Sequence, residues 1–227
     1  NGVIAHGRGE AFDYLLGELT IPEASKATKV AAAALLLANN PIISVNGNVA
    51  TLAPKEVVKL AESVGAKIEV NLFHRTLGRE IAIMKKMKTF GAKEVLGVGK
   101  AASLELNGLE SSRRWVDPKG IMTADTVLAP LEDGDRTAAL RKAGKTVITI
   151  DLNPLSRTAQ TASITIVDNI VRAMPLIVEE STILRKIDKN DLKDMIKRFD
   201  NKVNLNKSLG YIINRLEKIA ATRVNSQ

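Results

Sequence analysis

The strongest constraint on the fold is an alternation of short aliphatic runs with helical segments. The aliphatic runs have the length of buried strands, and they are residues 42–45, 67–72, 94–98, 125–131, 146–150 and 163–167. Segments with apolar residues at helical spacing separate most of them. Because strands that alternate with helices form βαβ units, the sequence predicts an α/β fold with a doubly wound, mostly parallel sheet and right-handed crossovers.

Start and stop signals mark several of the helical segments. Pro22 begins a helix that stops before Pro41, and Gly65 fits the position after the helix of residues 54–64. From about residue 170 onward the chain is predicted to be helical. We therefore divide it into a core of residues 1–178 and a C-terminal helical extension of residues 179–227, whose apolar faces pack on the core or on a second subunit.

Composition limits the classes of partner. The chain has 227 residues, a net charge of +8 and a pI near 9.7, which favour anionic ligands such as nucleotides and phosphorylated metabolites. Only 3% of residues are aromatic and the basic residues are dispersed, which argues against a site for single-stranded nucleic acid. No apolar run reaches the roughly 20 residues of a membrane span. The absence of cysteine excludes thiol chemistry and favours a cytoplasmic location.

Two consecutive strand-to-helix junctions form the leading candidate for a binding site. The first runs from Asp151 through Leu152 and Asn153 to a short helix that Ser156 caps, with Arg157 and Thr158 in its first turn. At the second junction, Asn169 caps the helix that begins at Ile170. Ligands of parallel sheets bind beyond the carboxyl ends of strands, where helix N-termini attract phosphate. These residues can also be simple caps, but two such corners in tandem favour a nucleotide site.

Residues near the N-terminus and after the first strand are further candidates. In Gly7-Arg8-Gly9, either the glycines form a tight turn or they allow Arg8 to grip a phosphate. Asn46-Gly47-Asn48 is either a hairpin turn or a pair of amides that bind a polar substrate.

An acidic turn follows the strand candidate of residues 125–131. Asp135 is either the cap of the next helix or, together with Asp133, a ligand of Mg²⁺ that bridges nucleotide phosphates. In that second case Arg136 neutralises charge that develops on the phosphates. With two histidines and no cysteine, the chain is not expected to hold a structural zinc ion.

Two other classes of function remain open at this point. Residues 97–102 match the pattern G-x-G-x-x-A after a strand, which motivates a dinucleotide-dependent oxidoreductase, although no clear helix follows them. The positive charge motivates a non-catalytic module that binds nucleotides or nucleic acid.

Several blocks of the sequence resemble the archaeal phosphopantothenate synthetase family, also called 4-phosphopantoate–β-alanine ligases. The blocks are VIAHGRGEAFDYLLGE (3–18), SVNGNVA (44–50), VNLFHRT (70–76), PLEDGDRTAAL (130–140) and TVITIDLNPLSRTAQTASITIVDNIVRA (146–173). The C-terminal helices resemble the family in character only, and residues 99–123 fit no pattern that we can place. The resemblance implies a homodimeric, Rossmann-like enzyme of coenzyme A synthesis. It would join 4-phosphopantoate to β-alanine through an acyl-adenylate, converting ATP to AMP and diphosphate.

The resemblance also implies a set of site residues. The implied ATP contacts are Arg8, Asp151, Leu152, Asn153, Arg157, Thr158, Asn169 and Ile170, with a further arginine ahead of the first block, outside the printed sequence. As hypotheses, we add Asp133, Asp135 and Arg136 to Arg8 as catalytic residues, and His6, Asn46, Asn48 and Arg75 as contacts of phosphopantoate. Mg²⁺ is expected with ATP, and the carboxylate that binds it is left open.

Overall fold

A five-stranded parallel sheet forms the centre of the molecule. The computed structural model describes the backbone of residues 2–224 and the side chains of residues 9–222. The strands are β1 (Pro41–Val45), β2 (Lys67–Val70), β5 (Thr126–Leu128), β6 (Thr146–Ile150) and β7 (Ile164–Ile166). They lie in the order β2-β1-β5-β6-β7, and every pairing is parallel. This confirms the predicted α/β sheet. The chain adds β2 on one side of β1 and adds β5, β6 and β7 on the other side, so the topological switch point of the sheet lies between β1 and β5.

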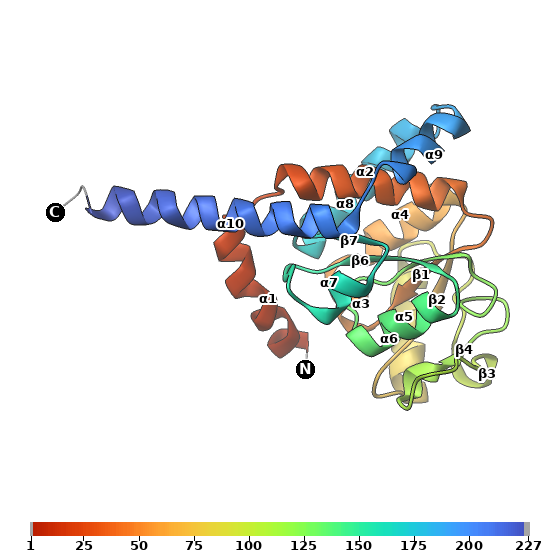
Figure 1. The fold of residues 1–227 in the computed structure, drawn as a ribbon. Coiled ribbons are helices and arrows are strands. Elements are labelled where there is room, and N and C mark those ends of the chain that lie inside the picture. The colour runs from red at the N-terminus through yellow and green to blue at the C-terminus, as the bar shows by residue number, and fades with distance from the viewer. Residues whose placement is uncertain (1, 225–227) are drawn as a thin grey trace.

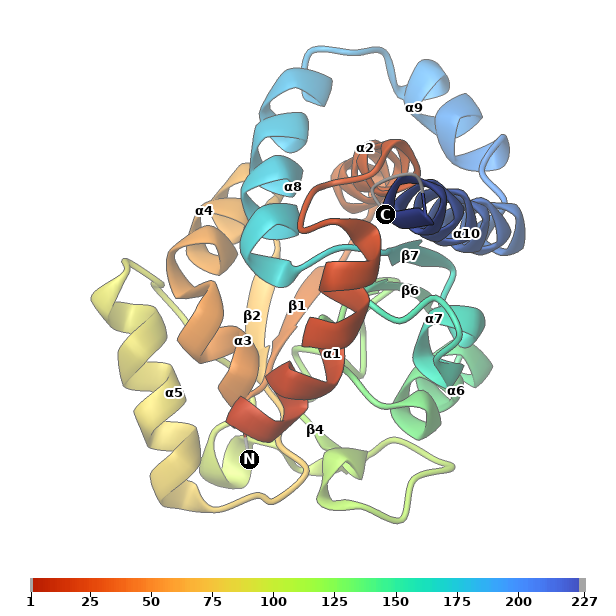
Figure 2. The same cartoon turned by 90° about the vertical axis from the view of Figure 1, so that its left-hand side faces the viewer.

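Helices cover both faces of the sheet (Figures 1 and 2). The helices described are α1 (Gly2–Leu16), α2 (Pro22–Leu37), α3 (Gly47–Leu52), α4 (Pro54–Val64), α5 (Leu77–Thr89), α6 (Gly134–Lys142), α7 (Arg157–Thr161), α8 (Ile170–Leu184), α9 (Lys189–Lys197) and α10 (Asn201–Val224). The larger hydrophobic core lies under α2, α4 and α8, and the smaller one lies under α6 and residues 106–124.

Successive residues of the central strands enter opposite cores. The smaller core contains Ile42, Val127 and Val147, whereas the larger core contains their neighbours Ile43, Leu128 and Ile148. Because side chains alternate along a strand, a strand covered on both faces is apolar throughout. This explains why the strands appear in the sequence as continuous aliphatic runs.

The predicted strand of residues 94–98 is wrong. Only Leu96 forms a bridge, to Glu69 of β2. Gly97 then turns away with a φ of 75°, and a Cβ on it would lie 2.6 Å from the carbonyl oxygen of Val70. The chain therefore leaves the edge of β2 after one residue and enters an irregular excursion.

The excursion folds onto the sheet with little regular structure of its own. It contains the 3₁₀ turns η1 (Gly99–Ala101) and η2 (Ser112–Arg114) and a small antiparallel pair of strands, β3 (Leu104–Glu105) and β4 (Trp115–Val116). This agrees with the absence of a clear sequence period in residues 99–123.

Two turns that the sequence offered as possible local structures are also wrong. Residues 46–48 are not a hairpin turn, because α3 begins at Gly47 with Asn46 as its cap. Residues 7–9 are not a tight turn either, since they lie within the backbone of α1. In the C-terminal part, Pro175 lies inside α8, and α8 also contains the boundary that we predicted between residues 178 and 179.

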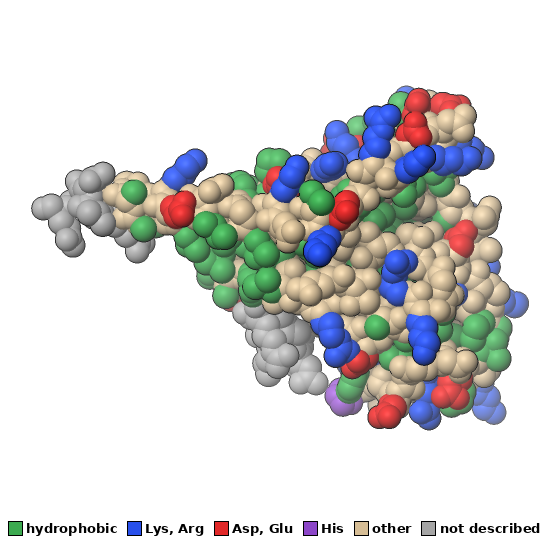
Figure 3. Space-filling model, viewed as in Figure 1, with side chains coloured by type: hydrophobic (Ala, Val, Ile, Leu, Met, Phe, Trp, Pro, Cys, Tyr) green, Lys and Arg blue, Asp and Glu red, His purple; other side chains and the backbone are tan. Residues whose placement is uncertain are grey.

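The last helix covers the edge of the sheet at β7 and then extends beyond the body of the molecule (Figure 1). Asn201 accepts the Thr165 N–H at 2.8 Å, and Asn204 donates to the Thr165 carbonyl oxygen at 3.1 Å. Figure 3 shows hydrophobic side chains gathered along α10 where it leaves the body. Within residues 2–224, no helix is both long and apolar enough to span a membrane.

Substitution of Asn201 by alanine is expected to lower the free energy of unfolding by about 2 kcal/mol. The change leaves the N–H of Thr165, on a buried strand, without its acceptor, and it also removes the amide that donates to the carbonyls of Ala159 and Ala162. Urea denaturation measures the effect. Asn214→Ala, at an exposed position of the same helix, is the matched control, and an equal small effect of both changes would contradict this role of Asn201.

Candidate functional site

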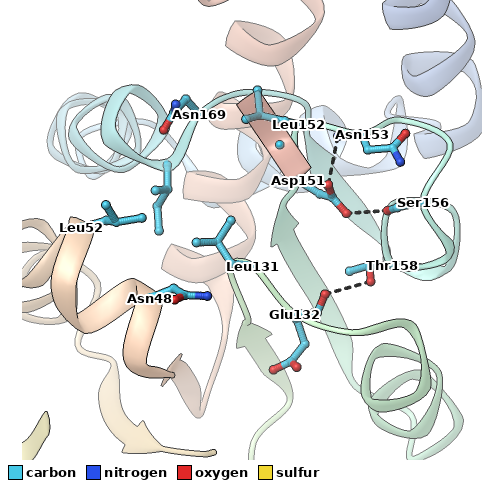
Figure 4. Close-up of a pocket in the computed structure, with 12 residues that line it drawn as sticks. Asn48, Leu52, Leu131, Glu132, Asp151, Leu152, Asn153, Ser156, Thr158 and Asn169 are labelled. Atoms are coloured by element: carbon cyan, nitrogen blue, oxygen red, sulfur yellow. Dashed lines mark hydrogen bonds between the residues drawn. The ribbon is translucent and has the colours of Figure 1, made fainter. Parts of the chain in front are cut away.

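A pocket of about 330 Å³ opens at the carboxyl ends of β1, β5, β6 and β7 (Figure 4). Its lining comes from the segments that follow these strands and from α1, and consists of Gly9, Asn48, Leu52, Leu131, Glu132, Asp151, Leu152, Asn153, Ser156, Thr158, Asn169 and Ile170. The structure therefore brings six of the predicted ATP contacts together: Asp151, Leu152, Asn153, Thr158, Asn169 and Ile170. Their gathering at one edge follows from parallel strand order, which aligns the carboxyl ends.

At the first junction, Asp151 is held in a fixed orientation. Its carboxylate accepts the N–H of Asn153 at 2.9 Å and the hydroxyl of Ser156. Ser156 in turn accepts the N–H of Ala159 at 2.9 Å, which confirms it as the cap of α7. Burial raises the pKa of Asp151, while the bonds from Ser156 and Asn153 lower it. A carboxylate fixed in this way at a pocket wall can accept hydrogen bonds from a pair of ligand hydroxyls.

At the second junction, Asn169 caps α8 as predicted, but its side chain is fully engaged within the protein. Its Oδ1 accepts the N–H of Val171, and its Nδ2 donates to Asp13 of α1 at 2.9 Å. Asp13 also pairs with Arg172, which bonds to Asp168 at 2.8 Å. The first turn of α8 is thus tied to α1. The N–H of Asn169 donates to Asp168, and its carbonyl oxygen accepts the N–H groups of Arg172 and Ala173, so the backbone of Asn169 is engaged within the protein as well.

Helix α1 rests directly on the pocket. A Cβ on Gly9 would lie 3.1 Å from Cδ1 of Leu152, so the absence of a side chain at Gly9 permits this close approach. The side chains of His6 and Arg8 lie outside the described residues, and their predicted roles stay predictions.

Arg157 lies on the exposed side of α7. It pairs with Asp135 of α6, and 65% and 77% of the two side-chain surfaces are exposed. Its neighbour Thr158 lines the pocket and donates to the Glu132 carbonyl oxygen at 3.0 Å. Asp135 is not the helix cap, because Asp133 accepts the N–H of Arg136 and caps α6.

Asn46 and Asn48 have different positions. Asn46 is buried and accepts the N–H groups of Asn48 and Val49, while its Nδ2 donates to the carbonyl oxygens of Pro130 and Leu131. It therefore joins the segment after β1 to the segment after β5. Asn48 lines the pocket.

A buried ionic cluster lies behind the β5 side of the pocket. Glu132 pairs with both Arg113 and Arg136, and Arg113 also pairs with Asp133. Arg136 is 0% exposed and donates to the Ser44 hydroxyl at 3.0 Å; burial lowers its pKa to about 10. The structure therefore does not place Arg136 against the pocket, and we assign it a supporting position behind Glu132. Neither Glu132 nor Arg113 was predicted from the sequence as part of the site. For Arg113 the reason is its position in the irregular excursion, which has no sequence period.

Arg75 is also away from the pocket. It pairs with Glu80 and donates to the carbonyl oxygens of Gly97 and Gly99, so it fixes the start of the excursion. The Gly97 and Gly99 N–H groups donate to the carboxylates of Asp117 and Glu80. These donors are occupied by carboxylates, which removes the local support for a dinucleotide loop at residues 97–102.

Glu69 of β2 is a buried carboxyl that anchors the excursion. It accepts the N–H of Asp117 at 3.0 Å and that of Ile121 at 2.6 Å. Burial raises its pKa from 4.5 to about 7, against the lowering effect of those bonds and of Arg136.

The pKa of Glu69 predicts a dependence of stability on pH. Because its folded pKa exceeds its unfolded pKa, its stabilising contribution is present below pH 4.5 and is lost as pH rises through 7. The Glu69→Gln variant lacks this titrating group and serves as the reference. As pH rises from 4.5 to 7, the stability of the wild type relative to Glu69→Gln should therefore fall by about 3 kcal/mol. Denaturant titrations at several pH values measure it, with exposed Glu62→Gln as the control. A rising or constant difference would contradict the prediction.

No group of three or more His, Cys, Asp or Glu side chains that could hold a metal ion occurs among the described side chains. Asp133 and Asp135, the predicted Mg²⁺ ligands, both form ion pairs with arginines.

Comparison with known proteins gives a consistent result. Residues 23–215 match the family model described as phosphopantothenate/pantothenate synthetase. A protein of Methanosarcina mazei is 54% identical over 220 residues, which cover 97% of this chain and 86% of the relative. Relatives from Thermococcus onnurineus and Methanospirillum hungatei are 52% and 45% identical, covering 96% and 95% of this chain and 84% and 86% of their own lengths. All three are named 4-phosphopantoate–β-alanine ligase. With matches of this extent, the chain belongs to the phosphopantothenate/pantothenate synthetase family.

Proposed function

We propose that the protein is an ATP-dependent ligase that condenses 4-phosphopantoate with β-alanine in coenzyme A synthesis. The observation that carries the proposal is the convergence of two consecutive β–α junctions, residues 151–158 and 169–170, on one pocket of a chain that belongs to this family. A cytoplasmic location and the absence of nucleic-acid partners stay predictions.

The reaction has two steps. The carboxylate of the acid attacks the α-phosphorus of ATP, which forms an acyl-adenylate and releases diphosphate. The amine of β-alanine then attacks the acyl carbon, loses a proton, and AMP leaves with the bonding electrons. The first step brings two anions together, so catalysis requires positioning and neutralisation of charge rather than a protein nucleophile.

The pocket residues fit distinct parts of ATP. Asp151 accepts hydrogen bonds from the ribose hydroxyls, and Asn169 and Ile170 line the part of the wall that faces the nucleoside. Thr158 and Arg157 meet the phosphates at the start of α7, where Arg157 can leave its exposed partner Asp135. Arg8 remains the predicted contact between ATP and the acid.

Mg²⁺ fits this arrangement as a companion of the triphosphate. At nucleotide sites it binds the phosphates together with one or two carboxylates, and Asp135, exposed beside Arg157, can supply one. The ion would neutralise phosphate charge when bound.

We also propose a homodimer. Exposed hydrophobic residues lie on α1 and α10, namely Tyr14, Val203, Ile213 and Leu216. Figure 3 shows hydrophobic side chains gathered where α10 leaves the body of the molecule. Sedimentation velocity tests whether the protein is a dimer in solution. A protein that stays monomeric at high concentration would contradict the proposal.

The activity is tested by incubating the protein with Mg-ATP, 4-phosphopantoate and β-alanine and measuring AMP and phosphopantothenate. We expect both products only when all three substrates are present. Tight NADH binding without ATP binding would favour an oxidoreductase instead. Salt-dependent binding to duplex DNA, with no AMP from any substrate pair, would favour a binding module.

Arg157→Ala is expected to weaken ATP binding about tenfold, because it removes charge-assisted hydrogen bonds to the phosphates. Isothermal titration calorimetry measures the affinity. Since Arg157 is exposed, the melting temperature should not change. Lys142→Ala, on the exposed end of α6, is the control, and equal ATP affinities in both variants would contradict the placement of the phosphates.

A further inference from the structure

We propose that Arg113, in the irregular excursion, is a positioning residue for the ATP site. It acts through the peptide group between Glu132 and Asp133, which orients the side chain of Thr158 at the pocket wall. This role rests on the proposed function, since Thr158 is one of the predicted ATP contacts.

The peptide group between Glu132 and Asp133 is bonded at both ends. Its carbonyl oxygen accepts the hydroxyl of Thr158 at 3.0 Å, and its N–H donates to Oε1 of Glu132 at 2.9 Å. Figure 4 shows the bond to Thr158, with the Glu132 carboxylate directed away from that residue. Because a peptide group is planar, a restraint on its N–H also sets the direction of its carbonyl oxygen. The carboxylate of Glu132 therefore determines where Thr158 finds its acceptor.

Two arginines hold the two oxygens of this carboxylate. Arg113 pairs with Oε1, the oxygen that also receives the Asp133 N–H, whereas Arg136 pairs with Oε2. Arg113 pairs with the Asp133 side chain as well, so it contacts the residues on both sides of the peptide group. Loss of Arg113 would release the oxygen that restrains the peptide group, while Arg136 would keep the buried carboxylate paired. The expected effect is therefore a displacement of the pocket wall rather than unfolding.

The excursion holds Arg113 in place from its own side. Asn71, which follows β2, donates to the carbonyl oxygens of Arg113 and Trp115 at 3.2 and 3.3 Å. The guanidinium carbon of Arg113 lies 5.7 Å from the centre of the Phe73 ring, a cation–π contact. Both the backbone and the side chain of Arg113 are thus attached to the segment after β2. This attachment lets an element without regular structure deliver a charge to the rear of the pocket wall.

Thr158 depends on its direction because its hydroxyl has a single proton. The Glu132 carbonyl oxygen receives that proton, which leaves the lone pairs of the hydroxyl oxygen for a ligand. Water that Mg²⁺ carries on the phosphates of ATP is a donor that matches them. Thr158 is almost completely buried and lines the pocket, so a change in the direction of its hydroxyl would be felt at the phosphates.

The test is a double-mutant cycle of Arg113→Gln and Thr158→Val, with the dissociation constant of Mg-ATP measured by isothermal titration calorimetry. Each single variant is expected to weaken binding about fivefold, the effect of losing one oriented hydrogen bond. In the Thr158→Val background, Arg113→Gln should add less than about twofold, since the group that Arg113 positions is absent.

Arg114→Gln is the matched control for this cycle. It removes the same charge from the neighbouring position, where the partner is Glu105 and the ion pair is exposed, and the affinity for Mg-ATP should stay unchanged. Arg113→Lys should restore the affinity that Arg113→Gln loses, because one nitrogen of Arg113, Nη1, makes both of its ion pairs.

Melting temperatures verify folding of each variant. If Arg113→Gln does not fold, Asn71→Ala takes its place in the cycle, because it loosens the backbone at Arg113 and leaves every charge present. Weaker binding of Mg-ATP in Asn71→Ala, with no further weakening when Thr158→Val is already present, is the expected result there.

An equal effect of Arg113→Gln with and without the Thr158 hydroxyl would overturn the inference and indicate an effect of charge alone. Unchanged affinity in Arg113→Gln would overturn it as well. If the wild type binds Mg-ATP but makes no AMP from the acid and β-alanine, the proposed ligase function fails, and the cycle still decides the role of Arg113. If the wild type does not bind Mg-ATP, both proposals fail.

Discussion

Replacement of Glu132 by alanine is expected to lower the free energy of unfolding by roughly 3–5 kcal/mol. Glu132 is the shared partner of Arg113 and Arg136, and its side chain is almost completely buried. The change leaves Arg136, which is fully buried, without its carboxylate, and it removes one of the two carboxylates that pair with Arg113. Buried charges without a partner are strongly destabilising, so we expect a shift in the urea midpoint followed by circular dichroism.

Asp135→Ala is the matched control for this prediction. Asp135 also pairs with an arginine, but both side chains are exposed, and exposed pairs contribute less than about 1 kcal/mol. If the two variants lose similar, small amounts of stability, Glu132 does not hold the cluster together in the way described.

Asp151→Asn is expected to reduce kcat/KM for ATP about 100-fold, with little loss of stability. An amide has the shape of the carboxylate but has one acceptor oxygen and no charge, so it cannot accept both ribose hydroxyls in the same way. One oxygen remains to receive the Asn153 N–H or the Ser156 hydroxyl. Initial rates of AMP formation at varied ATP concentration measure the effect.

Asp188→Asn is the control for Asp151→Asn. Asp188 caps α9 and accepts the Asn190 N–H at 2.8 Å, far along the chain from the pocket segments. Equal kcat/KM values in the two variants would show that Asp151 is only a local turn residue.

Local patterns explain what the sequence predicted correctly. Strands β1, β5, β6 and β7 are buried on both faces, so their aliphatic runs are continuous and easily identified. The caps Ser156 and Asn169 act within their own turns. Because parallel strands end at one edge, these local features were sufficient to place the two junctions together.

Features that depend on distant residues could not be predicted in the same way. The aliphatic run of residues 94–98 resembles a strand, but the close contact of Gly97 with Val70 turns the chain away. Arg136 was expected to face a ligand, yet Glu132 and Ser44 retain it in the interior. Its burial depends on the tertiary arrangement, and Arg113 reaches the same cluster from an excursion without a sequence period.

Asn46 and Asn48 illustrate the same limit within one turn. Both amides follow β1, and the sequence treats them alike. The structure separates them, because the carbonyl groups of Pro130 and Leu131 engage Asn46, whereas Asn48 lines the pocket. The positions of those carbonyls depend on the pairing of β1 with β5, which the local pattern does not contain.

We propose that the junctions after β6 and β7 form the ATP site, and a crystal structure with a non-hydrolysable ATP analogue is the decisive test. We expect ribose density within hydrogen-bond distance of Asp151 and phosphate density along the first turn of α7, at Thr158 and Arg157. An analogue bound at another part of the molecule, with Asp151 and Asn169 making no contact to it, would show that these junctions are not the ATP site.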